Sequence, residues 1–156
     1  MVRELPPGLT HLFAQTKLYT DGEEYVIISL PVERQREAVT LFAQLYGLFG
    51  ALLFDKDEVT LVVPWAVWEG VREALGGFEE ARGYRLITFD LPLELGLVGY
   101  LATASSLLAE QGISIYALSA YARDHILVRE DEFDRAWAIL SGFITRCQAA
   151  LSESAG

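Results

Sequence analysis

The sequence predicts an α+β protein built from two consecutive units, each with the element order βαββα. A pattern of apolar residues repeats at a separation of 66 positions (106 − 40), since residues 40–44 (TLFAQ) resemble residues 106–110 (SLLAE). Each half also opens with a β-rich run that ends at a proline, and then contains two β runs separated by a polar turn. Such units form antiparallel sheets with helices on one face, which is the ferredoxin-like arrangement.

The first strand of each unit is predicted at residues 25–30 (YVIISL) and 84–91 (YRLITFDL). Both runs are rich in β-branched and aromatic residues, which favour strands. Pro31 and Pro92 follow them. Because proline has no backbone N–H to donate to a sheet, each first strand should end there.

A helix is predicted after each first strand, at residues 33–45 and 99–111, where apolar residues recur at helical spacing. Gly47 and Gly112 supply the expected helix ends. A hairpin and a closing amphipathic helix should follow in each half. The hairpin strands are residues 48–54 and 59–63, then 113–121 and 125–128, and the closing helices are residues 65–75 and 131–149.

These elements predict a first unit at residues 1–80 with an N-terminal extension, a second unit at 81–150, and a polar tail at 151–156. Residues 78–83 are predicted to be a short connector. A complete ferredoxin-like sheet needs a fourth strand. The first unit could take it from around residues 82–89, or each unit could complete its sheet against the other.

Composition limits the classes of partner. The 22 acidic and 12 basic side chains give a formal charge of −10, which repels nucleic acid and anionic membranes, so neither is an expected partner. Hydrophobic residues make up 52% of the 156 residues, and the mean hydropathy is +0.27. We therefore expect another copy to cover apolar surface, in a homodimer or higher homo-oligomer.

One cysteine, Cys147, and two isolated histidines, His11 and His125, lie at no spacing typical of a metal site. We therefore predict no metal, no cofactor and a reducing, cytoplasmic location. Residues 1–15 lack the basic end and apolar run of an export signal. The uncharged residues 95–109 are too few and too polar to span a bilayer.

The second half resembles a known family. Residues 84–128, and above all 109–128 (AEQGISIYALSAYARDHILV), resemble the second unit of small two-unit ACT proteins, which include the cytosolic arginine sensors of animals. Residues 25–31 (YVIISLP) and 48–64 (LFGALLFDKDEVTLVVP) resemble a degenerate first ACT unit. The likeness covers about residues 18–140.

This resemblance implies an effector-binding fold, usually paired or oligomeric, that holds an amino acid between adjacent ACT units. The pocket is then formed by the loop after the first strand, here residues 90–99, and by strand residues of the neighbouring unit. The sequence departs from the commonest pattern at Ala122 and Arg123, where a polar pair such as Thr-Asp is frequent before the aspartate, here Asp124. The identity of the ligand is therefore open.

The loop at residues 90–99 is about five residues longer than its counterpart, because the prolines are separated by 61 positions (92 − 31) and the helices by 66. Its glycines let a backbone approach a ligand, and amides at the start of a helix attract a carboxylate. Its acidic residues could pair with an amino group. A plain glycine turn and solvated carboxylates are the alternatives. The predicted ligand-binding residues are Asp90, Leu93, Glu94, Gly96, Leu97, Val98, Gly99, Ser119, Tyr121 and Asp124.

No nucleophile motif or phosphate-binding glycine loop is visible, so we predict a protein that is not an enzyme. Gly96 and Gly99 alone do not make a dinucleotide fingerprint, which needs a third glycine. The predicted function is a non-catalytic regulatory module that binds a small amino acid and could regulate a protein partner. The alternative is a constitutive dimerisation or scaffold domain without a ligand.

Overall fold

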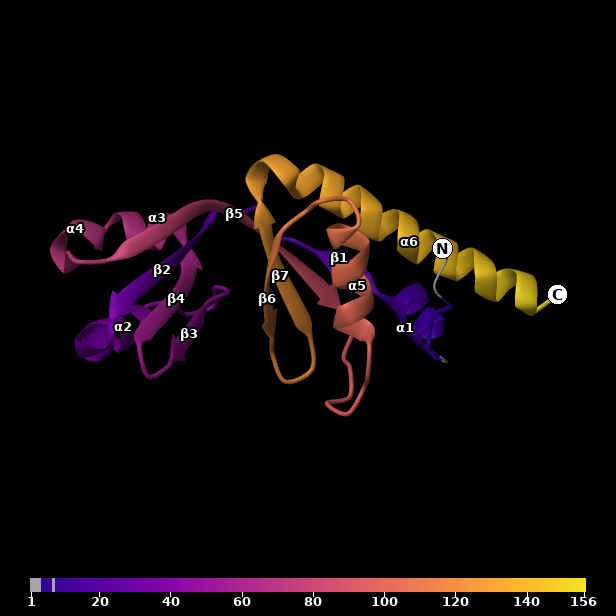
Figure 1. Ribbon diagram of the computed structural model, residues 1–156, viewed down its shortest axis with the longest axis horizontal. Coiled ribbons are helices and arrows are strands. Elements are labelled where there is room, and N and C mark those ends of the chain that lie inside the picture. Colours follow the sequence, from indigo (N-terminus) through magenta and orange to yellow (C-terminus); the bar gives the residue numbers. More distant parts are fainter. Residues whose placement is uncertain (1–3, 7) are drawn as a thin grey trace. The chain divides into compact units, whose positions relative to one another are not determined.

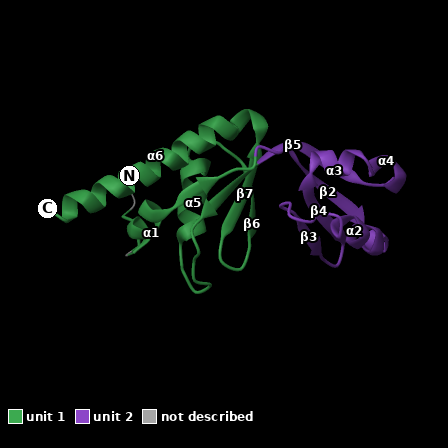
Figure 2. Ribbon diagram, turned by 180° about the vertical axis from the view of Figure 1, so that it is seen from behind, with its two compact units in different colours: residues 1–21, 86–156 green, residues 22–85 purple. Residues whose placement is uncertain are grey.

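The computed structural model describes residues 4–6 and 8–156. The chain divides into two compact units (Figure 2), of which unit 1 comprises residues 1–21 and 86–156, and unit 2 comprises residues 22–85. Unit 2 is therefore inserted in the chain between two parts of unit 1.

Unit 2 contains a βαββαβ series in one continuous segment (Figure 1). Residues 79–84 of β5 pair with β2, so that the strand order in this unit is β5-β2-β4-β3. This is a complete ferredoxin-like unit. Its elements are β2 (Tyr25–Pro31), a 3-10 turn (Val32–Arg34), α2 (Gln35–Phe42), β3 (Ala51–Phe54), β4 (Glu58–Pro64), α3 (Trp65–Glu69), α4 (Arg72–Leu75) and the first part of β5 (Glu79–Asp90).

The core of unit 2 lies between its sheet and its helices. Side chains alternate between the two faces of a strand, and every second residue of β2 and of β4 is buried in one cluster with residues of α2 and α3. Both helices therefore cover the same face of the sheet. The cluster includes Val26, Ile28, Leu30, Ala38, Leu41, Val59, Leu61, Val63 and Trp68.

Unit 1 uses the second part of β5 as its first strand and is completed from the N-terminal segment. β5 pairs with β7 and with β1, and β7 pairs in turn with β6. Ile87 and Phe89 of β5 are buried with residues of α5 and α6 in the core of this unit. Its elements are α1 (Leu9–Gln15), β1 (Lys17–Tyr19), α5 (Tyr100–Ala109), β6 (Ile115–Ser119), β7 (Asp124–Arg129), a 3-10 turn (Glu130–Glu132) and α6 (Phe133–Ser154).

The N-terminal segment is an integral part of unit 1. β1 runs antiparallel to β5, with Leu18 opposite Phe89, and α1 packs against α6. The ring of Phe13 stacks on that of Tyr100 at a centroid distance of 4.2 Å and an interplanar angle of 4°. β1 thus fills the place of the fourth strand.

The two-unit, ferredoxin-like α+β fold with antiparallel hairpins is confirmed. The predicted division at residue 80 differs from the observed one, because residues up to 21 group with residues 86–156 instead of with the first unit. Sequence analysis recognised only an N-terminal extension, without α1 and β1.

Two boundary predictions were wrong. The expected connector at residues 78–83 is strand, since β5 begins at Glu79 and places Glu80 opposite Ile28. This first part of β5 is the fourth strand of the unit 2 sheet, which sequence analysis gave as one of two alternatives. The expected tail at residues 151–156 is helical as far as Ser154, because no proline or glycine lies between Gly142 and Gly156 to end α6 earlier.

No helix in the described part of the chain is long and apolar enough to cross a membrane.

Candidate functional site

The loop before α5 and the turn of the β6–β7 hairpin lie at the same end of unit 1 (Figure 1). The backbone N–H of Leu93 donates to the carbonyl oxygen of Ala122 at 2.7 Å. Arg123 Nε donates to Asp90 Oδ1 at 2.8 Å, so the turn is also tied to the end of β5. These contacts bring together two segments that are about thirty positions apart in the sequence.

A cavity of about 240 Å³ lies between these segments and the first turn of α5. This volume is just below the roughly 300–1,000 Å³ of pockets for drug-sized ligands, so a molecule of amino-acid size suits it. The lining residues are Leu93, Glu94, Leu95, Leu97, Gly99, Tyr100, Leu101, Ala102, Ser119, Ala120, Tyr121, Ala122, Arg123 and Asp124.

The first turn of α5 forms one wall of the cavity. Gly99 precedes the helix with a φ of 94°, in the left-handed region that glycine adopts without strain. The carbonyl oxygen of Gly99 accepts from the backbone N–H of Thr103 at 3.0 Å and from Thr103 Oγ1 at 2.7 Å. The first amides of a helix have no partner within it and attract negative charge, so this wall suits a carboxylate.

The hairpin supplies polar groups. Ser119 Oγ donates to Asp124 Oδ1 at 2.7 Å, so the hydroxyl holds the orientation of the carboxylate. Next to Asp124, His125 Nδ1 lies 2.8 Å from Thr88 Oγ1, and burial lowers the pKa of His125. The imidazole is therefore neutral at pH 7.

Tyr100 links the cavity wall to the N-terminal segment. Its hydroxyl oxygen lies 2.6 Å from Thr16 Oγ1, and both side chains are buried. Burial raises the pKa of Tyr100 to about 12, although the contact with Thr16 acts in the opposite direction. Tyr100 therefore stays neutral and positions the first turn of α5.

Most of the predicted ligand-binding residues line this cavity. Asp90, Gly96 and Val98 do not, although Asp90 contacts the wall through Arg123. The residues that do line it are Leu93, Glu94, Leu97, Gly99, Ser119, Tyr121 and Asp124.

Sequence reasoning missed Tyr100 and Arg123 as wall residues, together with several alanines and leucines. Arg123 carried a signal, because it departs from the family pattern directly before Asp124. Tyr100 carried no such signal, since an aromatic residue at the start of an apolar helix is usually interpreted as part of the core.

Unit 2 has no loop of comparable length at the equivalent place. Its β2 ends at Pro31 and passes directly into the 3-10 turn Val32–Arg34. A shallow groove of about 330 Å³ lies elsewhere in this unit, along α2 and residues 71–75. We therefore take the loop–hairpin cavity of unit 1 as the candidate site.

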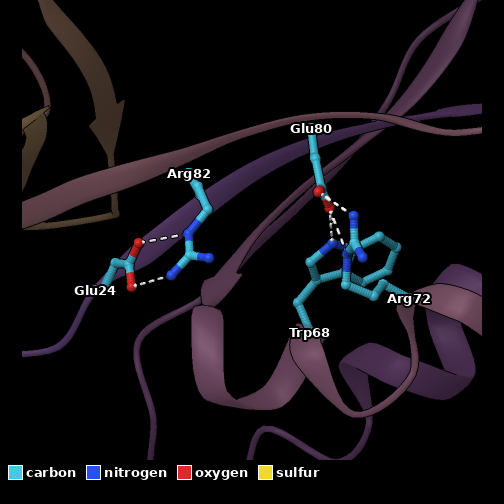
Figure 3. A network of polar contacts seen from close by, with 5 residues as sticks. All are labelled: Glu24, Trp68, Arg72, Glu80 and Arg82. Atoms are coloured by element: carbon cyan, nitrogen blue, oxygen red, sulfur yellow. Dashed lines mark hydrogen bonds and ion pairs between the residues drawn. The ribbon is translucent and has the colours of Figure 1, made fainter.

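A network of ion pairs braces the fourth strand of unit 2 (Figure 3). Arg82 donates two bonds of 2.9 Å to the Glu24 carboxylate. Glu80 accepts from Arg72 and from Trp68 Nε1. The pKa values of Glu24 and Glu80 lie below their ordinary range, in each case chiefly because the arginine donates to the carboxylate. We assign this network a structural role.

Residues 79–142 match the sequence model of the ACT domain family. Every residue that lines the cavity falls within this segment. No curated protein matches the chain. Within the described residues, no three histidine, cysteine or acidic side chains are grouped as metal ligands.

Several solved structures share the fold. A protein of unknown function from Vibrio cholerae, described as a possible transport protein, superposes with a TM-score of 0.65 at 23% identity, over 85% of this chain and 92% of that one. A protein from Agrobacterium tumefaciens gives a TM-score of 0.66 at 23% identity, over 82% and 88%. The ligand-free regulatory subunit of aspartate kinase from Thermus thermophilus gives 0.62 at 12% identity, over 82% and 97%. Residues 79–142 thus match the ACT domain family, and the chain has the ferredoxin-like fold of aspartate kinase regulatory subunits.

Proposed function

We propose that the chain is a non-catalytic regulatory module whose unit 1 binds a free amino acid in the loop–hairpin cavity. The single observation that carries the proposal is the cavity itself, which lies within the segment that matches the ACT family. The likeness to a regulatory subunit of aspartate kinase supports the class of function. The relationship to arginine sensors remains a prediction.

The chemistry of the walls suits a zwitterion. The amides of Tyr100 and Leu101, at the positive end of α5, would receive the α-carboxylate. The Asp124 and Glu94 carboxylates, which also line the cavity, would receive the α-ammonium group, with bonds that are strengthened by charge. The two charged ends of an amino acid thereby match groups of opposite polarity in the cavity lining.

The mouth of the cavity is open to solvent, and two apolar side chains of the lining are largely exposed. Leu95 is 71% exposed and Tyr121 is 81% exposed. We propose that an ACT unit of a second copy covers this mouth and completes the pocket, so that ligand binding stabilises a homo-oligomer by population shift. The cytoplasmic location and a regulated protein partner stay predictions of the sequence.

A thermal-shift screen against the common amino acids tests the proposal. A ligand that binds only the folded state, present at a hundredfold excess over its Kd, adds about 2.7 kcal/mol. For a chain of this size that raises Tm by roughly 5–10 °C. Asp124→Ala should weaken binding at least tenfold, whereas Asp57→Ala, at the exposed turn of the other hairpin, should leave it unchanged. Equal effects of the two variants would remove Asp124 from the site.

The competing function is a constitutive scaffold. The observation that favours it is the edge strand β3 of unit 2, where Leu53 is 57% exposed and Phe54 is 45% exposed. An unpaired edge with apolar side chains invites pairing with another chain. A screen in which no amino acid changes Tm, together with a dimer that forms without any ligand, would favour this function.

A further inference from the structure

The charges at the cavity are unequal, and the imbalance bears on which amino acid can bind. Glu94 and Asp124 line the wall as anions, and Arg123 is the cation among the lining residues that the structure describes. Arg123 is already engaged, because its Nε donates to Asp90 Oδ1 at 2.8 Å. Asp90 does not line the cavity, so it acts on the cavity through Arg123.

An anionic side chain entering this site would meet an unfavourable field. With Asp90 counted, the cavity lining and its immediate neighbour hold three carboxylates and one guanidinium. Like charges within a few ångströms disfavour one another, and an unoccupied cation beside the side chain would offset that repulsion. Because Arg123 is paired with Asp90, its positive charge is less available to an anionic ligand.

The uncharged part of the wall is aliphatic. It offers leucine side chains that remain partly accessible to solvent, with Leu97 at 36% exposure on the loop. Covering such surface with an apolar group stabilises a complex by about 25 cal/mol per Å² of apolar area removed from water. The aliphatic residues of the wall are Leu93, Leu95, Leu97, Leu101, Ala102, Ala120 and Ala122.

We infer that the cavity disfavours an amino acid with an anionic side chain, and that Asp90 sets this selectivity by occupying Arg123. The inference rests on the proposed function, because it concerns the same site. One wall carboxylate receives the α-ammonium group, the leucines cover the side chain, and a dicarboxylic amino acid is rejected. Asp90 is a positioning residue for specificity and need not touch the ligand.

The test is the ratio of affinities for L-leucine and L-aspartate, measured by calorimetry on the full chain at low ionic strength. The wild-type protein should bind leucine more tightly. Asp90→Asn should free Arg123 and shift the ratio toward aspartate about fivefold, which corresponds to the roughly 1 kcal/mol of a partly exposed ion pair. Asp90→Glu should keep the wild-type ratio, because it preserves the ion pair.

Two further variants separate a specific effect from a general one. Asp57→Asn removes the same charge from an exposed turn of unit 2 and should leave the ratio unchanged. The double variant Asp90→Asn with Arg123→Gln should lose the gain for aspartate, because the freed cation is gone. If Asp90→Asn does not fold, Arg123→Gln alone should reject aspartate at least as strongly as the wild type.

The outcomes distinguish this inference from the proposed function. If no amino acid binds the wild-type protein, the proposed function fails and the inference fails with it. If leucine binds but Asp90→Asn leaves the ratio within twofold, or Asp57→Asn shifts it equally, only the inference is overturned. A wild-type preference for aspartate over leucine would also overturn it.

Discussion

The hydrogen bond between Tyr100 and Thr16 joins the helix that forms a cavity wall to a residue 84 positions earlier in the chain. Thr16 Oγ1 donates its single hydrogen to the carbonyl oxygen of Leu12 at 2.8 Å. The Tyr100 hydroxyl must therefore be the donor in the 2.6 Å contact with Thr16. Tyr100 is 2% exposed and Thr16 is 4% exposed, so water cannot replace either partner.

The direction of this bond predicts unequal costs for the two single substitutions. Tyr100→Phe keeps the ring stacked on Phe13 and leaves only a hydroxyl acceptor unused, which should lower the free energy of unfolding by about 1 kcal/mol. Thr16→Val leaves the Tyr100 hydroxyl without an acceptor and removes the bond to Leu12, which should lower the free energy of unfolding by about 2–3 kcal/mol. At roughly 2–4 °C per kcal/mol, the second substitution should lower Tm by about twice as much as the first.

The double variant gives the decisive comparison. Because both changes remove the same bond, their combined cost should be smaller than the sum of the single costs by about 1 kcal/mol. Urea denaturation followed by circular dichroism measures all four free energies. Tyr46→Phe is the control, since Tyr46 is 97% exposed and should change stability by less than about 0.5 kcal/mol. If the two single costs add up to the cost of the double variant within about 0.3 kcal/mol, the two side chains are not coupled. That result would also refute the role of the N-terminal segment in holding α5.

Two further predictions concern the loop glycines and the braced strand. Gly99→Ala should destabilise the protein by about 1–2 kcal/mol, because the φ of Gly99 is 94° and a Cβ would lie 3.4 Å from Leu9 Cδ1. Gly96→Ala is the control, since a Cβ at Gly96 would meet nothing within 4 Å. This control should leave the free energy of unfolding unchanged in the same urea titration. Glu80→Gln should destabilise the protein at pH 7. Since the folded-state pKa of Glu80 is lowered, this stabilisation exists above the unfolded-state value of about 4.3 and disappears as pH falls through the folded-state pKa. The difference in Tm between wild type and Glu80→Gln should therefore shrink on acidification, and a constant difference from pH 7 to pH 3 would contradict the account.

Local pattern alone predicted most of the elements and the class of fold. The run at residues 25–30, ended by a proline, is strand β2, and the turns at residues 55–57 and 120–123 connect the two strands of each hairpin. Proline, glycine and apolar periodicity act on neighbouring residues, so a single sequence carries them directly. The same reasoning singled out the loop at residues 90–99, because its extra length and glycines are visible without a partner.

The tertiary structure alone decided which segments meet. β1 has three residues, too few for a periodic signal, and its place beside residues 88–90 depends on a pairing about seventy positions away. The engagement of Arg123 by Asp90, and the approach of the hairpin turn to Leu93, depend likewise on contacts between distant positions. Sequence by itself determined the chemistry available to the site, whereas the long-range pairing of strands determined which of those side chains share a cavity.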